Sequence, residues 1–397
     1  MLLFLLGSTT GCQQLPLPEI FPSQGTAEAE APTESPAEAS EAAETEPQST
    51  AAATETNGEM PETGDEDITP YNSYAYSMLS DAEQQVYREV YHGLVSGQET
   101  KLSTLEDDVL KQAFKYVLYD HPEIYYTDGF HYSSESIGDT RLSLSLIPQY
   151  TLSEAEKEET DARLAERLSE VLAAAPTSSD YEKALYAYDW VVENTDYTTD
   201  AVNGQNVLSV FLDGQSVCNG YAKAFQLLLQ KMEIPAVLVT GKAKNGSHAW
   251  VAACLDGVWS LFDPTWGEPG ISNEAFSGIQ FVNHTYFALT SADMGLDHEA
   301  LGDLTIPDCS DDSHSYFRQA GSYFTSCDME GLRRCFREAQ ENEASAVQFR
   351  CEDTELREEF LHELLDNQMV YRFLNGQTKA SYFVNEGLNV VTFLMKS

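Results

Sequence analysis

The chain has 397 residues and a formal net charge of -43, from 65 acidic and 22 basic residues. Because nucleic-acid binding depends mainly on Lys and Arg displacing counterions from phosphates, this charge argues against a nucleic-acid partner. The length exceeds that of one average domain, so we expect two or three folded units.

The first residues, MLLFLLGSTTG, form a short apolar run that ends in small residues and is followed by Cys12. A helix needs roughly 20 apolar residues to span a bilayer, so this run is too short for a membrane span. Residues 1–12 are therefore predicted to be an export signal. They resemble a bacterial lipoprotein signal, in which the cysteine is acylated, so we expect lipid on Cys12. A truncated ordinary signal or a misplaced start is the alternative.

Residues 13–69 are rich in Pro, Ala, Glu and Thr and carry almost no aromatic residue after Phe21. Such a segment cannot bury enough apolar surface to offset its ordering entropy, so it is predicted to be a disordered acidic linker. Behind a lipid anchor it would hold the folded units away from the outer face of the bacterial cytoplasmic membrane. A purely solubilising tail is the alternative.

Residues 70–175 have the pattern of an α+β region without visible chemistry. Capping boxes that begin at Ser80 and Ser153 predict two helix starts. Leu142, Leu144 and Leu146 alternate with polar residues, which predicts a half-buried strand.

Residues 309–397 form a second α+β pattern, predicted to be an accessory domain. It consists of a helix near 328–339, a strand over 346–351, a helix over 354–365, a strand over 369–374, and two strands around 382 and 390.

Seven cysteines lie at positions 12, 218, 254, 309, 327, 335 and 351. No Cys-x-x-Cys pair or zinc-type spacing occurs among them, and no calcium loop is present, so no metal or other cofactor is predicted. In an exported protein Cys327 could pair with Cys335, or Cys309 with Cys351, and the sequence leaves both pairings open.

Cys218 follows a turn-forming stretch and directly precedes the helix-forming run AKAFQLLLQKM. It is therefore predicted to lie in the first turn of a helix. Unpaired amides and the positive end of the helix dipole favour a thiolate at that place. Taken alone, a buried structural cysteine is the commoner interpretation.

Three strands are predicted after this helix, over 236–240, 248–255 and 258–263, with a hairpin turn at Asp256-Gly257. A turn centred there places Trp250 opposite Asp263, and two residues further on it places His248 opposite Thr265. His248 and Asp263 are then diagonal neighbours on one face, about 7 to 8 Å apart at the backbone, with side chains able to meet. In isolation a core histidine and a turn-forming aspartate are the simpler interpretations.

A thiol at a helix start, an imidazole and a carboxylate that orients it are the parts of a thiol acyl-transfer site. We predict Cys218 as nucleophile, His248 as base and Asp263 as the orienting group. Cys254 shares the strand face of His248, but about 20 Å separates them, so Cys254 is predicted to pack in the core.

The segments GQSVCNGYA around Cys218, HAWV from His248 and DPTW from Asp263 resemble the core of the transglutaminase-like superfamily in its bacterial exported form. The similarity covers 181–266, with a looser tail that ends at Asp297-His298. It implies a papain-like α+β core over 176–308, in which the helix that bears the nucleophile packs on an antiparallel sheet.

The resemblance implies attack by Cys218 on a protein or peptide amide and a thioester intermediate. Cross-linking, deamidation and proteolysis remain open, because the acyl acceptor can be an amine or water. The amide of Cys218 would bind the oxyanion, and Gln215 is a candidate for the second donor. The family aromatics Tyr221, Trp250 and Trp266 are predicted to pack in the core.

Two alternatives belong to other classes of protein. One is a catalytically silent surface module that binds a partner on a transglutaminase-like fold. The other is a metal site made by Cys218, His248 and either His284 or His298, and the spacing of these residues disfavours it.

Overall fold

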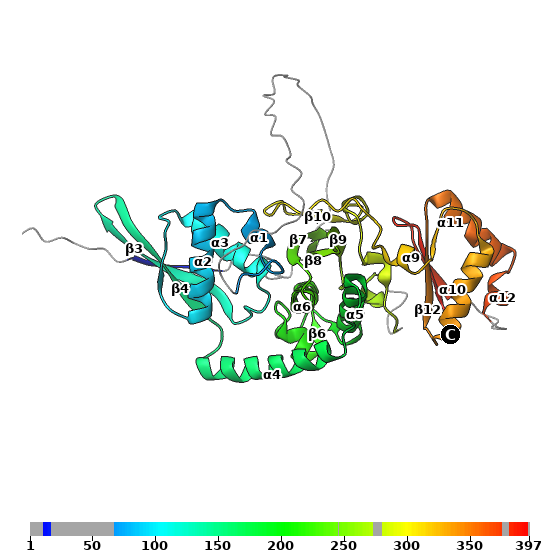
Figure 1. The fold of residues 1–397 in the computed structure, drawn as a ribbon, viewed down its shortest axis with the longest axis horizontal. Coiled ribbons are helices and arrows are strands. Elements are labelled where there is room, and N and C mark those ends of the chain that lie inside the picture. Colours follow the sequence, from blue (N-terminus) through cyan, green and yellow to red (C-terminus); the bar gives the residue numbers. More distant parts are fainter. Residues whose placement is uncertain (1–10, 17–66, 245, 273–279, 375–380, 396–397) are drawn as a thin grey trace, which may run out of the picture.

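The computed structural model describes residues 11–16, 67–244, 246–272, 280–374 and 381–395. Most of the predicted signal and linker therefore lies outside the described residues. Cys12 and the start of the predicted linker form strand β1 (Gly11–Pro16), which pairs antiparallel with β3. Figure 1 shows three units along one axis, with an N-terminal sheet at one end and a C-terminal unit at the other.

The N-terminal unit is a sheet with strand order β1-β3-β4-β2 and helices packed on it. Its further elements are α1 (Tyr74–Ser77), α2 (Asp81–Ser96), β2 (Thr100–Lys101), α3 (Asp107–Asp120), β3 (Thr127–Ile137) and β4 (Thr140–Tyr150). The capping box at Ser80 is confirmed. The predicted strand is β4, in which Leu144 and Leu146 are buried whereas Leu142 is 51% exposed.

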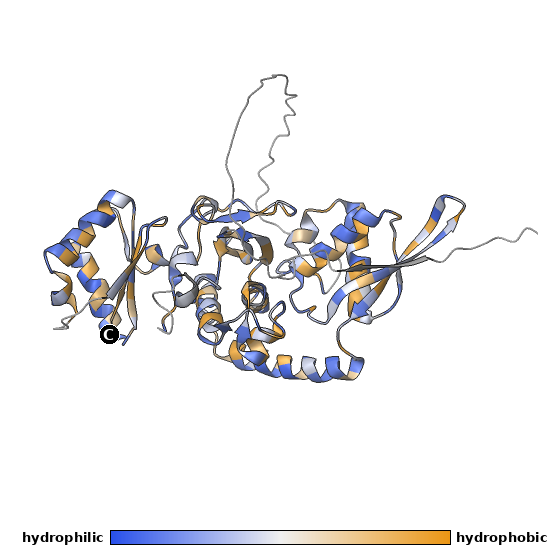
Figure 2. Cartoon of the chain, turned by 180° about the vertical axis from the view of Figure 1, so that it is seen from behind, coloured by the Kyte–Doolittle hydropathy of each residue, from blue (hydrophilic) through white to orange (hydrophobic). Residues whose placement is uncertain are grey.

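Helix α4 (Glu154–Ala173) begins at the predicted capping box of Ser153 and runs beneath the N-terminal and central units (Figure 1). It buries only Leu164 and Val171. Figure 2 shows many hydrophilic residues along it, as expected for a helix with one narrow apolar stripe. The hydroxyl of Tyr186 donates a hydrogen bond of 2.7 Å to the Val171 carbonyl and ties α4 to the central unit.

The central unit has the expected α+β architecture, a helix packed on an antiparallel sheet of strand order β10-β7-β8-β9. The sheet strands are β7 (Ala236–Ala243), β8 (Gly246–Leu255), β9 (Val258–Phe262) and β10 (His298–Ala300). Around them lie α5 (Asp180–Glu193), β5 (Asp196–Tyr197), η1 (Ser209–Asp213), β6 (Gln215–Ser216), α6 (Cys218–Lys231), α7 (Pro269–Ser272), η3 (His284–Tyr286) and α8 (Ser291–Met294). Helix α6 contacts β7 and β8 on one side and α5 on the other, so almost all of its residues are buried.

The N-terminal and central units share one apolar core. A single cluster of buried residues runs from Ile68 through Leu164 and Val171, across the predicted boundary at residue 175, and extends to Val390 of the C-terminal unit. Polar contacts reinforce the junction, because the Tyr119 hydroxyl lies 2.9 Å from the Thr240 hydroxyl. The two units therefore support the central sheet together.

The C-terminal unit has its own sheet, of strand order β11-β12-β14-β13, and its own apolar cluster. Its elements are α9 (Tyr316–Gln319), β11 (Tyr323–Phe324), α10 (Met329–Glu341), β12 (Ala346–Cys351), α11 (Thr354–Leu361), η4 (His362–Asp366), α12 (Val370–Phe373), β13 (Ser381–Asn385) and β14 (Val390–Leu394). The strand predicted over 369–374 is wrong. Val370, Phe373 and Leu374 are all buried at helical spacing, and helix α12 forms there instead.

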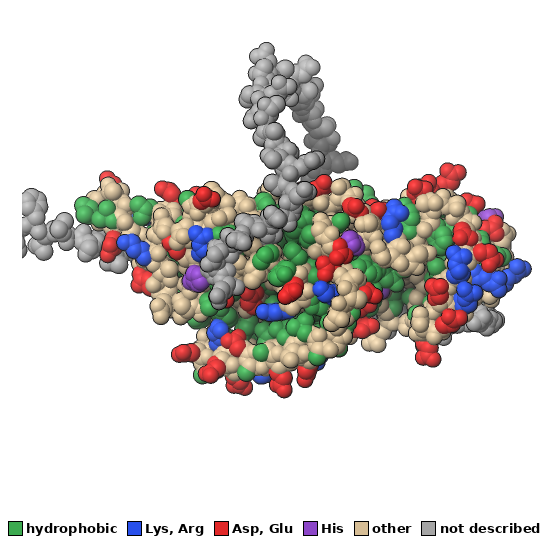
Figure 3. Space-filling model, viewed as in Figure 1, with side chains coloured by type: hydrophobic (Ala, Val, Ile, Leu, Met, Phe, Trp, Pro, Cys, Tyr) green, Lys and Arg blue, Asp and Glu red, His purple; other side chains and the backbone are tan. Residues whose placement is uncertain are grey.

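Figure 3 shows acidic side chains over much of the visible face, with basic side chains gathered at the end of the C-terminal unit. Among the described helices, none is both long and apolar enough to cross a bilayer. Cys309, Cys327, Cys335 and Cys351 are all free, so neither of the two disulfides left open by the sequence is formed.

Candidate active site

Cys218 is the first residue of α6, as predicted. Val217 caps the helix with extended backbone angles, and the preceding residues form β6, which pairs with β5. The Cys218 side chain is 8% exposed, so it lies at the surface of the core rather than deep within it. A thiol in this position faces the positive end of the α6 dipole.

Gly220 explains why a glycine follows Cys218 so closely. A Cβ at Gly220 would collide with the hydroxyls of Ser216 and Ser209 and would approach the Gly204 carbonyl to 2.9 Å. The Gly220 amide donates a hydrogen bond of 3.0 Å to that carbonyl, so the first turn of α6 packs directly on the loop before it. A residue without a side chain is therefore needed to seat the Cys218 turn.

The predicted hairpin register is confirmed. Strand β8 pairs with β9 so that Val251 faces Phe262 and Leu255 faces Val258. The same register, continued past the paired strands, places His248 and Asp263 diagonally, and their side chains meet. Nε2 of His248 lies 2.8 Å from Oδ2 of Asp263.

The carboxylate of Asp263 is fixed at both oxygens. Oδ1 accepts a hydrogen bond of 3.0 Å from the Thr265 amide, and Oδ2 accepts from His248. The Tyr188 hydroxyl donates to the Asp263 carbonyl at 3.0 Å. Because Asp263 is fully buried, these contacts give its side chain one orientation.

The electrostatics of the pair favour an ionised state. Burial by itself would lower the pKa of His248, but the Asp263 carboxylate and the neighbouring Cys218 raise that pKa to about 10. Burial by itself would raise the pKa of Asp263, whereas His248 and a second histidine, His298, hold it well below its usual range. The pair therefore stabilises an imidazolium beside a carboxylate.

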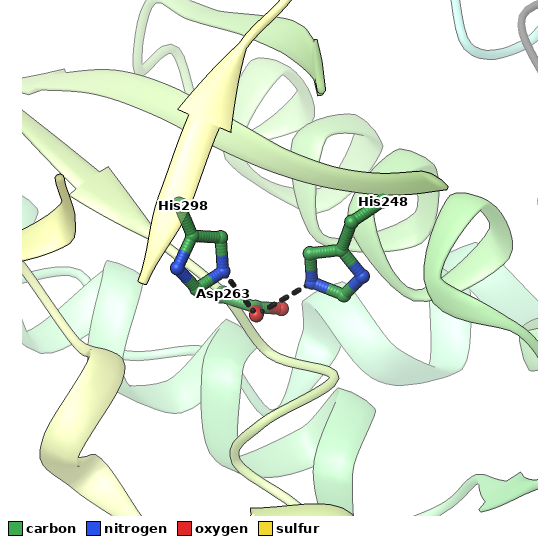
Figure 4. Close-up of side chains that lie close together, drawn as sticks. All are labelled: His248, Asp263 and His298. Carbon is green, nitrogen blue, oxygen red and sulfur yellow. Dashed lines mark hydrogen bonds and ion pairs between the residues drawn. The ribbon is translucent and has the colours of Figure 1, made fainter. Parts of the chain in front are cut away.

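Cys218 lies beside His248 and affects its protonation. The neighbouring Cys218 side chain is one of the groups that raise the pKa of the imidazole. Nε2 of His248 faces Asp263, and Figure 4 shows the other ring nitrogen, Nδ1, pointing away from the carboxylate. The structure thus brings all three predicted residues together in the order thiol, imidazole, carboxylate.

A further histidine, His298, also contacts Asp263. Its Nε2 lies 3.2 Å from Asp263 Oδ2, and its Nδ1 lies 2.6 Å from Oδ1 of Asp297 (Figure 4). Sequence reasoning placed Asp297-His298 only at the tail of the family resemblance and weighed His298 only as a metal ligand. His298 reaches the site because β10 pairs with β7, where His298 faces Ala243.

Aromatic rings enclose the two histidines. The Trp250 ring lies 6.2 Å from that of His248, and the Trp266 ring lies 4.5 Å from that of His298. Both tryptophans are buried, as is Tyr221, whose hydroxyl lies 2.7 Å from the Thr195 carbonyl oxygen and 2.9 Å from a carboxylate oxygen of Glu268. All three aromatics thus pack in the core as predicted, and the tryptophan rings lie against the imidazoles.

Two other predicted residues lie outside this cluster. Gln215 is exposed in β6, and Cys254 faces Trp259 across the hairpin. Burial raises the pKa of the Cys254 thiol, which makes Cys254 a poor nucleophile.

The metal arrangement considered from the sequence differs from the cluster in the structure. Among the described residues, the group able to surround an ion is His248, Asp263 and His298, with ligand atoms within 4.8 Å of one another, and Cys218 is not in it. His284 pairs with Asp189 at 2.7 Å instead. Nε2 of each histidine lies within hydrogen-bond distance of Oδ2 of Asp263, at 2.8 Å for His248 and 3.2 Å for His298.

The site thus consists of a cysteine at a helix start, beside a histidine from an antiparallel sheet and an aspartate at the end of that sheet's edge strand. Residues 166–264 match the model of the transglutaminase-like superfamily, and the chain therefore contains a transglutaminase-like core.

Individual relatives are distant. The Kyphoscoliosis peptidase of Mus musculus is 26% identical over 144 residues, which cover 32% of this chain and 21% of that protein. The Homo sapiens protein of the same name is 27% identical over 144 residues, with coverage of 32% and 21%. This chain thus spans about a fifth of the length of the relatives it matches.

Solved structures show a similar, partial correspondence. A crystal structure of a TGase aligns at 17% identity and a TM-score of 0.25, over 35% of this chain and 44% of that one. The periplasmic domain of TgpA from Pseudomonas aeruginosa, bound to ethylmercury, aligns at 16% identity and a TM-score of 0.23, over 35% and 64% of the two chains.

Proposed function

We propose that this chain is a thiol acyl-transfer enzyme that acts on protein or peptide amides. The Sγ of Cys218 attacks the amide carbonyl carbon and forms a tetrahedral oxyanion. His248 gives its proton to the departing amine, the C–N bond breaks, and a Cys218 thioester remains. Water or a second amine then gives up a proton to His248 and attacks the thioester, which releases Cys218.

One observation carries this proposal: Asp263 holds Nε2 of His248 at 2.8 Å, and the neighbouring Cys218 acts on the same imidazole and helps to raise its pKa. An imidazole held in this way takes a proton from the thiol on one side while the carboxylate fixes its orientation on the other. The enclosing tryptophans lower the local dielectric, which strengthens the charge interactions. Residues in a silent binding module need no such alignment.

The fate of the thioester defines three activities of the same site. An amine acceptor gives cross-linking, whereas water gives deamidation of a glutamine or cleavage of a peptide bond. The amide of Cys218, at the start of α6, supports oxyanion binding in each case.

The proposal is tested on the full chain by iodoacetamide labelling with peptide mapping, at several values between about pH 4 and pH 9. Wild type is compared with Cys218→Ala and His248→Ala, and Cys254→Ala serves as a control thiol on the same sheet. Glutamine-donor peptides are then supplied with a fluorescent amine or with water alone, and amine incorporation, ammonia and new peptide termini are measured.

The proposed enzymatic function is supported if Cys218 is labelled rapidly below neutral pH, if this labelling depends on His248, and if one class of peptide gives product. Labelling of Cys218 at the rate of an ordinary thiol, unchanged by His248→Ala, contradicts it and favours the silent binding module. Cys254→Ala is expected to behave like wild type in every assay, because its thiol is remote from the site.

We also propose that the chain is exported and anchored by lipid on Cys12. The support is the apolar run followed by small residues and Cys12. Labelled palmitate supplied to a bacterial host that expresses the full chain should enter the wild type and not Cys12→Ser. Equal incorporation, or none in either protein, would contradict the anchor.

A further inference from the structure

His298 is held between two carboxylates. Its Nε2 lies 3.2 Å from Oδ2 of Asp263, and its Nδ1 lies 2.6 Å from Oδ1 of Asp297. The imidazole is buried and packs against the rings of Trp250 and Trp266.

The two contacts determine the charge of His298. Ionised carboxylates only accept hydrogen bonds, and a neutral imidazole has one N–H to donate. Donation to Asp263 and to Asp297 at once therefore requires both ring nitrogens to carry a proton. His298 is thus an imidazolium, and burial, which opposes this charge, is outweighed by its contacts with Asp263 and Asp297, which raise its pKa.

The charged and titratable groups around His298 come from several segments packed against it. Three of them lie closest: His248 of β8, Asp263 after β9, and Asp297, which also accepts a hydrogen bond from Tyr286 of η3. Two more lie further out: Lys244, whose ammonium lies over the Trp266 ring, and Asp308, which lines the same pocket of about 310 Å³ as His298. The nearest of these, Asp263 and Asp297, are negative and His248 is positive when protonated. His248 and His298 therefore compete for the charge of Asp263, with ring centroids 5.3 Å apart.

We propose that His298 is a positioning residue of the active site: as an imidazolium clamped between Asp263 and Asp297, it fixes the Asp263 carboxylate and partly neutralises it. This inference rests on the proposed function. An unopposed Asp263 would hold the proton of His248 so tightly that the imidazolium could not deliver it to a leaving amine. The positive charge of His298 weakens that hold and moves His248 towards the proton affinity a general acid needs near neutral pH.

The clamp extends to the C-terminal unit. The Tyr286 hydroxyl donates a hydrogen bond of 2.6 Å to Asp297 Oδ2 and accepts one of 3.2 Å from the side chain of Asn385 in β13. Asp297 is therefore held on both oxygens, by His298 and by Tyr286. The orientation of His298 thus depends on residues that sequence places far from the thiol.

Two single variants and their combination test the charge of His298. His298→Gln keeps an N–H donor that can reach Asp263 but removes the positive charge. Asp297→Asn removes one negative charge beside His298. The double variant removes both charges and leaves the net charge of the cluster unchanged. The rate of Cys218 alkylation in the full chain is measured from about pH 4 to about pH 10, in EDTA and without it, and circular dichroism checks folding.

The two single variants are expected to shift the pH profile in opposite directions. In His298→Gln the positive charge is lost, so His248 binds its proton more tightly and the thiolate is less favoured. The acid and alkaline limbs of the profile, where the alkylation rate changes with pH, therefore both move to higher pH by about 1 unit. In Asp297→Asn both limbs move to lower pH, and in the double variant they lie close to their wild-type positions. A histidine that only fills space would change the amplitude and leave the limbs in place.

Each contrary result has its own meaning. If the wild-type profile depends on His248 but its limbs keep their pH positions in both single variants, the role of His298 is overturned. A shift that appears only without EDTA would also overturn it and assign His248, Asp263 and His298 to a metal. A wild-type profile that does not depend on His248 would instead sink the proposed function itself. Should His298→Gln fail to fold, the downward shift in Asp297→Asn still decides the matter.

Discussion

Arg350 of β12 and Asp293 of α8 form a bidentate ion pair, with Nη1 to Oδ2 at 2.9 Å and Nη2 to Oδ1 at 2.8 Å. It joins the C-terminal unit to the segment that leads into β10 and His298. Both side chains are mostly buried, at 15% and 21% exposure, so solvent screens the pair only in part.

We expect this pair to contribute measurably to stability. Arg350→Ala and Asp293→Ala should each lower the free energy of unfolding by about 1.5 to 3 kcal/mol, because each leaves a charged partner unpaired. A double-mutant cycle in urea should give a coupling of about 1 kcal/mol or more. The exposed pair Lys111 and Asp108 is the matched control and should couple by less than about 0.5 kcal/mol. Equal coupling in the two cycles would mean that the junction is not held by this pair.

Gly220 offers a second test, of the backbone that seats Cys218. Gly220→Ala should destabilise the protein by about 1 to 3 kcal/mol or more, because its Cβ collides with the hydroxyls of Ser216 and Ser209. It should also slow Cys218 alkylation, since the first turn of α6 must move. Gly246→Ala is the control, because its Cβ meets only the Ala243 carbonyl at 3.7 Å, an ordinary contact. Thermal unfolding and labelling rates measure both effects, and a fully stable Gly220→Ala would show that the turn is not tightly packed.

The part of the site that sequence could predict is the part built by local geometry. The residues around Cys218 indicate the start of a helix, and the Asp256-Gly257 turn sets the register that brings His248 next to Asp263. These three residues need one helix start and one hairpin. The diagonal contact follows from the turn's register together with strand alternation.

The rest depends on pairing between distant segments. His298 arrives through β10, a strand of three residues that pairs with β7, and nothing near His298 indicates that partner. Segment 369–374 was predicted as a strand, but Val370 and Phe373 turn inward on one face of α12. In both cases packing against a remote element decided the outcome, and local propensity could not.

The raised pKa of His248 makes stability depend on pH. Folding raises that pKa from 6.5 to about 10. The proton on His248 therefore stabilises the folded state fully below pH 6.5, and this contribution is lost as pH rises through about 10. We expect the difference in free energy of unfolding between wild type and His248→Gln to shrink steadily across that window, as measured by urea unfolding at several pH values. A difference that stays constant with pH would mean that His248 is neutral in the folded protein.

Asp263→Asn separates the orienting role of the residue from its charge. The asparagine keeps the shape, but its amide cannot accept from both imidazoles and from the Thr265 amide at once, and it no longer balances the charge on His248. We expect a loss of about 3 to 5 kcal/mol in stability near neutral pH, smaller at high pH where the imidazoles are neutral.

Turnover should fall roughly 10²- to 10⁴-fold in Asp263→Asn, and Cys218 alkylation below neutral pH should slow, because the imidazolium that supports the thiolate loses its carboxylate. Asp256→Asn is the matched control. Asp256 lies exposed in the turn of the same hairpin, with a φ of 50°, a conformation that asparagine adopts readily. This control should match wild type in urea unfolding, alkylation and peptide assays. If Asp263→Asn also matched wild type, the carboxylate charge would have no part in the reaction, and hydrogen bonding alone would orient His248.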